Sequence, residues 1–420
     1  MGGILSRLLG LPQITDADRA EWERQRQWEE AHPPPPLVPP EADEGAAGIY
    51  AWFADLVKVV LHKDRSCLVT YAGEEHRDLP GEPNPYEVNA RDVNEFLLRA
   101  VGVQDPEENG GLAHPWIVKY LGRLTPGFKL EFVSPGPLEA TRLPVLPVPI
   151  TNNTTPGPLT NSLPPLLRLY YRWALQTLSA LHFLHTHAVY ISDLCASSVW
   201  IRSDLSAALT GFVSATLPSA EYPSAQCGCR SGDNYLDFRE VEVEYDPETG
   251  DELEASPRAD ICDWATLFWR LLTNECSVDP PPGPTKVSWP MLFSGDDQDD
   301  WPVDWDGELE RERLRERRFQ HLEEARMGDI FVKAWSGEYN NVGEVMADLR
   351  ALLEKMGVEI IGEDEILPGD GRLWEDIFVV ILPHDAQGYW REIRLRESGG
   401  LDSRARTILG DQGYIQGSSD

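Results

Sequence analysis

Two groups of side chains have the chemistry of metal ligands. His182, His185 and His187 lie close together, and Cys227 and Cys229 are separated by one glycine. A structural zinc site needs four such ligands, and neither group is followed by residues that complete a set. We therefore expect no metal site. The histidines are predicted to lie at a helix end, and the cysteines to be free thiols in a loop.

Two acidic runs are candidate docking sites for a basic partner. Residues 240–254 hold eight carboxylates and no Lys or Arg, and residues 296–306 hold six carboxylates. The chain as a whole has 70 Asp plus Glu against 37 Lys plus Arg, a formal net charge of -33. This charge repels nucleic-acid phosphates and anionic lipids. The runs are either solvated loops or a docking surface. We expect a protein partner and no nucleic acid.

The cysteine count and the hydropathy indicate a cytoplasmic protein. Six cysteines in 420 residues are too few and too scattered for a disulfide framework. Residues 48–61 are interrupted by Asp55 and Lys58 and fall short of the ~20 apolar residues of a spanning helix. We expect neither a transmembrane segment nor a signal peptide. Gly2 and Ser6 match the N-myristoylation pattern, which predicts partial, reversible membrane association.

The elements that must position these side chains follow from the hydrophobic pattern. Apolar residues recur every three or four positions between Leu167 and Leu181, which predicts an amphipathic helix packed on a core. Further helices are predicted at 92–101, 261–272, 310–326 and 342–356. Strands are predicted at 57–61, 67–71, 116–121, 128–133, 199–201, 208–212 and 377–382.

Composition divides the chain into five parts. Proline runs cannot continue a helix or a strand interior, and they predict a disordered arm at 1–48 and a linker at 139–162. Residues 49–138 between them are β-rich, and residues 163–356 are mostly helical. Residues 357–420 are an extension to which the pattern assigns no role.

This order of parts, and the residues within them, resemble a bilobal protein kinase. The stretch Ser179-Ala-Leu-His-Phe-Leu-His-Thr-His-Ala-Val-Tyr-Ile-Ser-Asp193-Leu-Cys-Ala-Ser-Ser198-Val-Trp-Ile is similar to the end of the family's long helix, its catalytic loop and the next strand. Three more pieces follow the family's order: the fourth-strand entry His114-Pro-Trp-Ile-Val-Lys-Tyr-Leu-Gly122, the hinge Leu130-Glu-Phe-Val133 and the anchoring helix Asp260-Ile-Cys-Asp-Trp-Ala.

The resemblance covers about residues 50 to 355, and the pattern looks like that of fungal protein kinase domain-containing proteins. It implies an α+β fold with a small β-rich N-lobe at 49–138 and a larger helical C-lobe at 163–356. It also implies an ATP site between the lobes, which must be checked position by position.

The positions that hold ATP phosphates in the family carry other residues here. Phosphoryl transfer depends on a few groups that position the phosphates and neutralise their charge. Residues 62–66 replace the glycine-rich loop and include no glycine. Asp78 stands at the implied third-strand lysine, where a carboxylate repels phosphate. The helix residue that would pair with that lysine is either Glu95 or, in another register, Asn94.

The catalytic loop retains one family residue. Asp193 stands at the position of the catalytic base, and without its partners it is either a relic base or a structural cap. Asp260 is also present, and its implied role is to hold the loop backbone as a structural anchor. The other positions have changed chemistry: Ile191 and Ser192 replace His and Arg, Cys195 replaces Lys, Ser198 replaces Asn and Gly211 replaces the metal-binding Asp.

These positions favour a pseudokinase that acts as a regulatory or interaction module and requires no cofactor. The alternative is an atypical active Ser/Thr kinase that transfers the ATP γ-phosphate with Mg²⁺, using Asp193 as base and Lys58 or Lys63 to reach the phosphates. A third interpretation is an effector-like or metabolite-binding protein that uses the cleft near residues 130–133.

Overall fold

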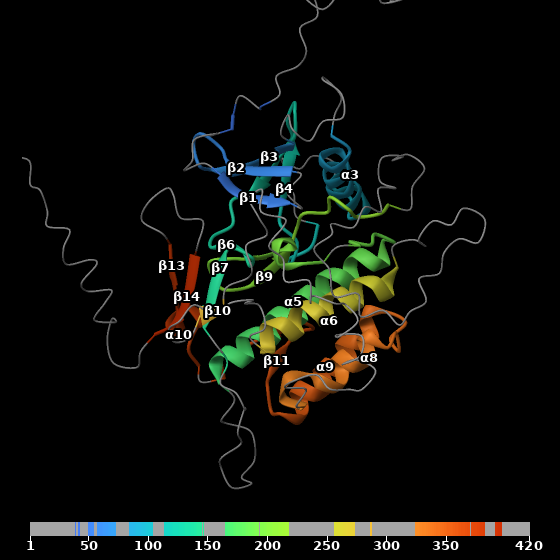
Figure 1. The fold of residues 1–420 in the computed structure, drawn as a ribbon, viewed down its shortest axis with the longest axis vertical. Coiled ribbons are helices and arrows are strands. Elements are labelled where there is room, and N and C mark those ends of the chain that lie inside the picture. Colours follow the sequence, from blue (N-terminus) through green and yellow to red (C-terminus); the bar gives the residue numbers. More distant parts are fainter. Residues whose placement is uncertain are drawn as a thin grey trace, which may run out of the picture.

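The computed structural model describes residues 38, 41–42, 49–53, 57–72, 84–103, 113–144, 146, 164–192, 194–217, 256–273, 286–287, 324–369, 371–382 and 391–396. Over these ranges the chain has a mixed α+β fold with several small sheets and six helices. A sheet and helix α3 (Pro85–Ala100) lie at the top of Figure 1, and below them lie α5 (Pro165–Thr186), α6 (Pro257–Thr273), α8 (Gly328–Trp335) and α9 (Val342–Lys355).

The upper sheet is antiparallel and has five strands. Across the sheet their order is β1 (Ile49–Phe53), β2 (Val57–Leu61), β3 (Cys67–Ala72), β5 (Phe128–Glu131) and β4 (Tyr120–Arg123). The strands predicted at 57–61 and 67–71 are confirmed. In the turn between them, the backbone N–H of Ser66 donates to Oδ1 of Asp64 at 2.8 Å, and the N–H of His62 donates to the carbonyl of Cys67 at 3.0 Å, which closes the hairpin.

Helix α3 (Pro85–Ala100) follows β3 and begins seven residues before the predicted helix at 92–101. The earlier start has a local cause. Asn84 is the N-cap, and its side chain accepts from the backbone N–H groups of Tyr86 and Glu87, while Pro85 occupies the first turn. The cap and the proline define a helix start that the apolar periodicity alone did not indicate.

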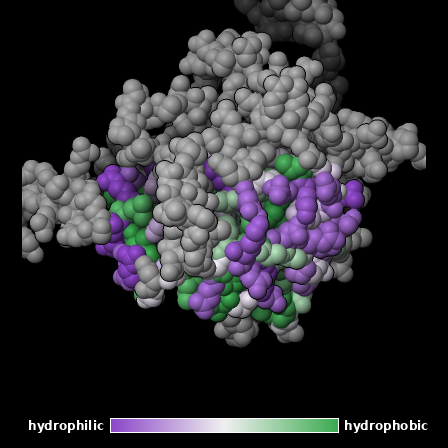
Figure 2. All heavy atoms as spheres, turned by 90° about the horizontal axis from the view of Figure 1, so that it is seen from below, coloured by the Kyte–Doolittle hydropathy of each residue, from purple (hydrophilic) through white to green (hydrophobic). Residues whose placement is uncertain are grey.

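The lower part is built around helix α5 (Pro165–Thr186), which confirms the amphipathic helix predicted there. Its neighbours are α6 (Pro257–Thr273), α8 (Gly328–Trp335) and α9 (Val342–Lys355). Because α5 is covered by α6, α9 and several strands, it is buried on nearly every face, including Arg168, Arg172 and Gln176. Figure 2 views the molecule from below, and on this face hydrophilic residues are interspersed with apolar ones.

Two smaller sheets complete this part of the fold (Figure 1). The first lies between the upper sheet and the helices, and the second lies beside the helices. One has the order β6 (Gly136–Pro137), β8 (Val199–Ile201), β9 (Ala207–Leu209). The other has the order β10 (Lys286–Val287), β7 (Thr141–Pro144), β14 (Arg391–Leu395), β13 (Phe378–Ile381). The remaining elements are the hairpin β11 (Ile360–Ile361) and β12 (Glu365–Ile366), helix α10 (Trp374–Ile377), and the 3-10 turns Ala196–Ser198 and Glu324–Arg326.

The predicted linker and extension contain ordered structure. Residues 141–144 of the linker form β7, in which Thr141 and Leu143 are buried. From the extension, β14 pairs with β7, and Ile366 and Trp374 are buried in the main core. The linker was assigned from its proline content, and the extension was given one strand, at 377–382, which the structure has as β13. Their apolar side chains are buried by partners more than 100 residues away in sequence.

Other predicted elements differ in length or lie outside the described ranges. The strand predicted at 116–121 begins only at Tyr120, because Val118 N–H bonds to the carbonyl of Leu209 at 2.9 Å instead of continuing the upper sheet. The strand predicted at 208–212 ends at Leu209, where Gly211 (φ +99°) turns the chain. Of the helix predicted at 310–326 only 324–326 is described, as a 3-10 turn. The arm at 1–48 is described only at 38 and 41–42.

Within the described ranges, no helix has the length and apolar character that a membrane crossing requires.

Candidate functional site

The candidate residues fall into two groups. Asp193, Asp78 and Gly2 lie outside the described residues. Of the others, four line one small hollow between β1 and the loop that precedes β8, together with Phe53. These four are Ile191, Cys195, Ser198 and Gly211, while Ser192 and Asp260 lie behind the loop and are buried.

The hollow has a volume of about 10 Å³. A cavity needs at least ~10–15 Å³ to hold one water molecule, so this one has no room for a phosphate group. Cys195 Sγ lies 3.0 Å from Ser197 Oγ and 3.5 Å from Ser198 Oγ. The thiol and the hydroxyls therefore contact one another across the floor of the hollow.

Aromatic side chains fill the space above the hollow. Phe53 from β1 stacks on Trp200 from β8, with ring centroids 5.6 Å apart, and Tyr50 packs on the same indole at 5.5 Å. Trp200 is fully buried, and its Nε1 donates to the carbonyl of Ser197 at 2.9 Å. Leu130 and Val133, at the edge where the sequence indicated an apolar cleft, are also buried. Among the residues that the structure describes, the rings of Tyr50, Phe53 and Trp200 thus pack together between β1 and β8.

Asp260 anchors the loop from behind. It begins the buried part of α6, and its carboxylate accepts from the backbone N–H groups of Ile191 and Ser192, both at 2.9 Å. His185 Nε2 lies 2.8 Å from the same carboxylate. Ser192 has φ +65°, a left-handed conformation that is unfavourable for a residue other than glycine. The carboxylate therefore holds the loop in a conformation that it would not adopt freely.

Asn89 joins helix α3 by hydrogen bonds to the segment that follows β9. The sequence analysis did not identify Asn89. Its side-chain amide donates to the carbonyls of Val213 at 3.1 Å and Ala215 at 2.7 Å, with a longer contact to Phe212 at 3.4 Å. Asn89 is fully buried. The sequence offered no signal for this residue, because Asn89 lies before the helix predicted at 92–101 and falls within α3 only in the structure.

The two residues considered for the helix carboxylate make other contacts. Glu95 forms an ion pair with Arg123 and accepts from the hydroxyl of Tyr120 at 2.8 Å. Burial acts to raise the pKa of Glu95, but the hydrogen bonds from Arg123 and Tyr120 outweigh it, so the pKa is lowered. Asn94 donates to the carbonyl of Ala90 in its own helix at 2.7 Å. Glu95 thus stabilises the contact between α3 and β4.

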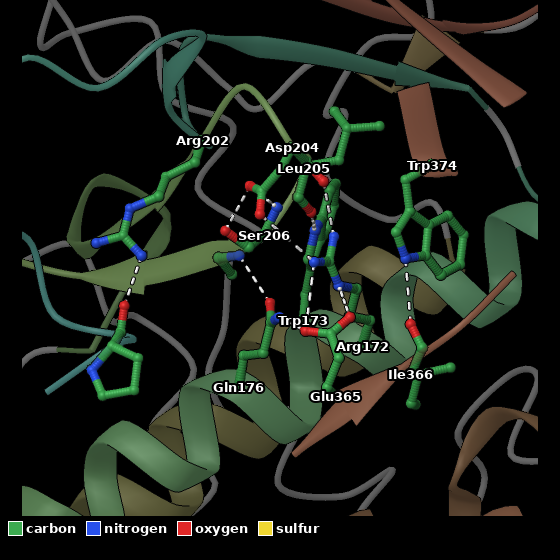
Figure 3. A network of polar contacts seen from close by, with 12 residues as sticks. Arg172, Trp173, Gln176, Arg202, Asp204, Leu205, Ser206, Glu365, Ile366 and Trp374 are labelled. Carbon is green, nitrogen blue, oxygen red and sulfur yellow. Dashed lines mark hydrogen bonds and ion pairs between the residues drawn. The ribbon is translucent and has the colours of Figure 1, made fainter. Parts of the chain in front are cut away.

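A second polar cluster centres on Arg172 of α5, and Figure 3 shows it. Arg172 Nε donates to Glu365 at 2.6 Å, and its Nη1 donates to the carbonyl of Asp204 at 2.8 Å. Gln176 donates to Glu365 at 2.9 Å and accepts from the N–H of Ala207 at 2.8 Å. The cluster joins α5, the β8–β9 turn and β12. Each of these polar groups has a protein partner, so the cluster is a structural joint rather than an open site.

The three histidines have separate surroundings. His185 bonds to Asp260, as above, and His187 Nδ1 lies 2.9 Å from the carbonyl of Phe183. His182 lines a surface groove with Gly343 and Arg350. Over the described part of the chain, no group of three or more His, Cys, Asp or Glu side chains is arranged to hold a metal ion.

No protein-family model matches this chain, and no curated protein matches it.

Proposed function

We propose that this chain has a bilobal protein kinase-like fold with a degenerate catalytic site, and that it works as a regulatory or interaction module. The order of its parts supports this proposal. A five-stranded sheet with one helix inserted between its third and fourth strands precedes a helical half built on a long buried helix. This agrees with the lobe order that the sequence resemblance implies.

The observation that carries the proposal is the contrast between the anchor and the hollow. Asp260 makes the contacts to the 191–192 backbone that a kinase-like loop requires. In front of that same loop, the hollow is about 10 Å³ in volume and Phe53 is part of its lining. Contacts that anchor the loop, together with a hollow too small for a phosphate group, support the proposal of a degenerate site.

The side chains that line the hollow also favour a degenerate site. Kinase catalysis needs a cation on the nucleotide phosphates and oxygen ligands for Mg²⁺. Among the residues that the structure describes, the lining of the hollow contains no Lys, Arg, Asp or Glu. Ser197, Ser198 and Ser214 supply hydroxyls there, and Cys195 supplies a thiol. Neutral donors of this kind cannot offset the charge of a triphosphate in a buried position.

Calorimetric titration with ATP tests this proposal. We expect no heat of binding with or without Mg²⁺, and no transfer of radiolabelled phosphate to a basic protein substrate. A Phe53→Ala variant, which removes one of the rings that line the hollow, serves as a matched comparison. Micromolar binding that depends on Mg²⁺, with transfer that Asp193→Ala abolishes, would instead establish the atypical active kinase.

The partner we propose is a basic protein, because the chain has a formal net charge of -33 and the summed field of such a surface favours cationic partners. We propose a cytoplasmic location, with membrane association only through an acyl chain on Gly2.

A further inference from the structure

Four segments of the chain meet at the ring of Tyr50. Tyr50 belongs to β1 and is 6% exposed. Its hydroxyl donates to the backbone carbonyl of Val133, in the segment at 132–137 that leads from the upper sheet toward the lower half. The ring packs on Trp200 of β8 at 5.5 Å. On the ring lies the guanidinium of Arg391, with its Cζ 4.5 Å from the ring centroid.

Strand β14 brings Arg391 to this point. It pairs in parallel with β7, with Arg391 opposite Thr141, and the N–H of Arg391 donates to the carbonyl of Ala140 at 2.9 Å. Thr141 is fully buried, and its hydroxyl donates to the carbonyl of Pro137 at 2.7 Å. β14 is therefore added beside the stretch of chain that connects the upper sheet to the lower half, as the red and green strands at the side of Figure 1 show.

The ring of Tyr50 packs so closely on the 132–137 segment that position 136 must be a glycine. Gly136 has φ +98°, and a Cβ at this position would overlap the hydroxyl of Tyr50. A glycine is thus required both by the backbone conformation and by the approach of the ring. The contact between β1 and the 132–137 segment therefore requires glycine at position 136.

The guanidinium of Arg391 is largely removed from water, and this burial lowers the pKa of the side chain. A desolvated cation gains most from the face of an aromatic ring. The ring of Tyr50 provides such a face, so the link between β14 and β1 is stronger than an exposed cation–π contact.

We propose that β14 is a strap that holds the upper sheet in place: through Arg391 on Tyr50, it fixes β1 against the 132–137 segment and against Trp200. Separation of β14 from β7 then loosens β1 and uncovers the aromatic side chains between the two halves. The extension thus acts as a conformational device that sets how firmly the upper sheet is held. This inference depends on the contacts of Tyr50 and stands apart from the proposed function.

Hydrogen–deuterium exchange of the full chain, followed by mass spectrometry, tests the strap. The variant is Arg391→Ala, and the matched control is Arg394→Ala on the same strand, since Arg394 donates to Glu392 of β14 itself at 2.5 Å. In Arg391→Ala we expect exchange of peptides covering 49–53 and 132–137 to accelerate on the order of tenfold, as loss of a desolvated cation–π contact would produce. In Arg394→Ala we expect these peptides to exchange as in the parent.

Two results would overturn the strap. One is parental exchange at 49–53 and 132–137 in Arg391→Ala. The other is equal acceleration in both variants, which would mean that any change in β14 disturbs the sheet. If Arg391→Ala does not fold, Arg391→Gln replaces it, because glutamine keeps polarity and much of the length but lacks the charge. Acceleration at the same two peptides is then expected, and its absence refutes the proposal.

Discussion

Replacement of Asp260 by alanine is the most direct test of how the loop is held. The carboxylate is fully buried and accepts from the N–H groups of Ile191 and Ser192 at 2.9 Å. In Asp260→Ala both N–H groups lose their partner. A buried donor without an acceptor costs about 1–3 kcal/mol. For the two donors together we expect a loss of about 2–6 kcal/mol.

The comparison with His185→Ala separates the two kinds of contact. His185 Nε2 lies 2.8 Å from Asp260, and its replacement leaves both backbone bonds intact. We therefore expect a smaller loss, about 1–3 kcal/mol. Asp260→Asn should be intermediate, because one amide oxygen can still accept while the amide N–H₂ faces another donor.

Thermal unfolding and urea titration measure these differences. A loss of about 2–6 kcal/mol corresponds to a melting temperature roughly 4–24 °C lower for a domain of 150–250 residues. Hydrogen exchange should rise at 189–192 in Asp260→Ala, because Ser192 is released from its left-handed conformation (φ +65°). An Asp260→Ala protein that melts within 1 °C of the parent, or that loses no more than His185→Ala, would show that the anchor is not what holds this loop.

The remaining predictions concern pH and the N-terminus. Burial lowers the pKa of His114 to about 4, with Asp364 acting to raise it, whereas an unfolded histidine titrates near about 6.5. The unfolded chain therefore takes up this proton first, and stability is lost as the pH falls from about 6.5 toward 4. His114→Phe should reduce the change of melting temperature over this range, and an unchanged profile would contradict the assignment. For Gly2, the intact mass after expression in a eukaryotic host should include a myristoyl group that Gly2→Ala removes. An unmodified N-terminus in the parent would end that proposal.

Periodicity in the sequence was sufficient for the elements whose pattern is local. The helix on Leu167 to Leu181 was predicted from the spacing of its apolar residues, and the strands at 57–61 and 67–71 from short β-rich runs on either side of a polar turn. The sequence also showed which side chains surround the loop at 191–198. Ile191, Ser192, Cys195, Ser198 and Gly211 cannot supply the charges of a phosphate site in any fold.

Tertiary structure alone decided what occupies the space between the halves. Tyr50 and Val133 are 83 residues apart, and Arg172 and Glu365 are 193 residues apart. No periodic pattern relates such residues, because a contact at that separation depends on how complete elements pack. The aromatic filling around Trp200 and the place of Arg391 on Tyr50 arise in this way. The sequence by itself determined which side-chain types stand around the loop, and the packing of distant strands determined that the rings of Tyr50, Phe53 and Trp200 meet between β1 and β8.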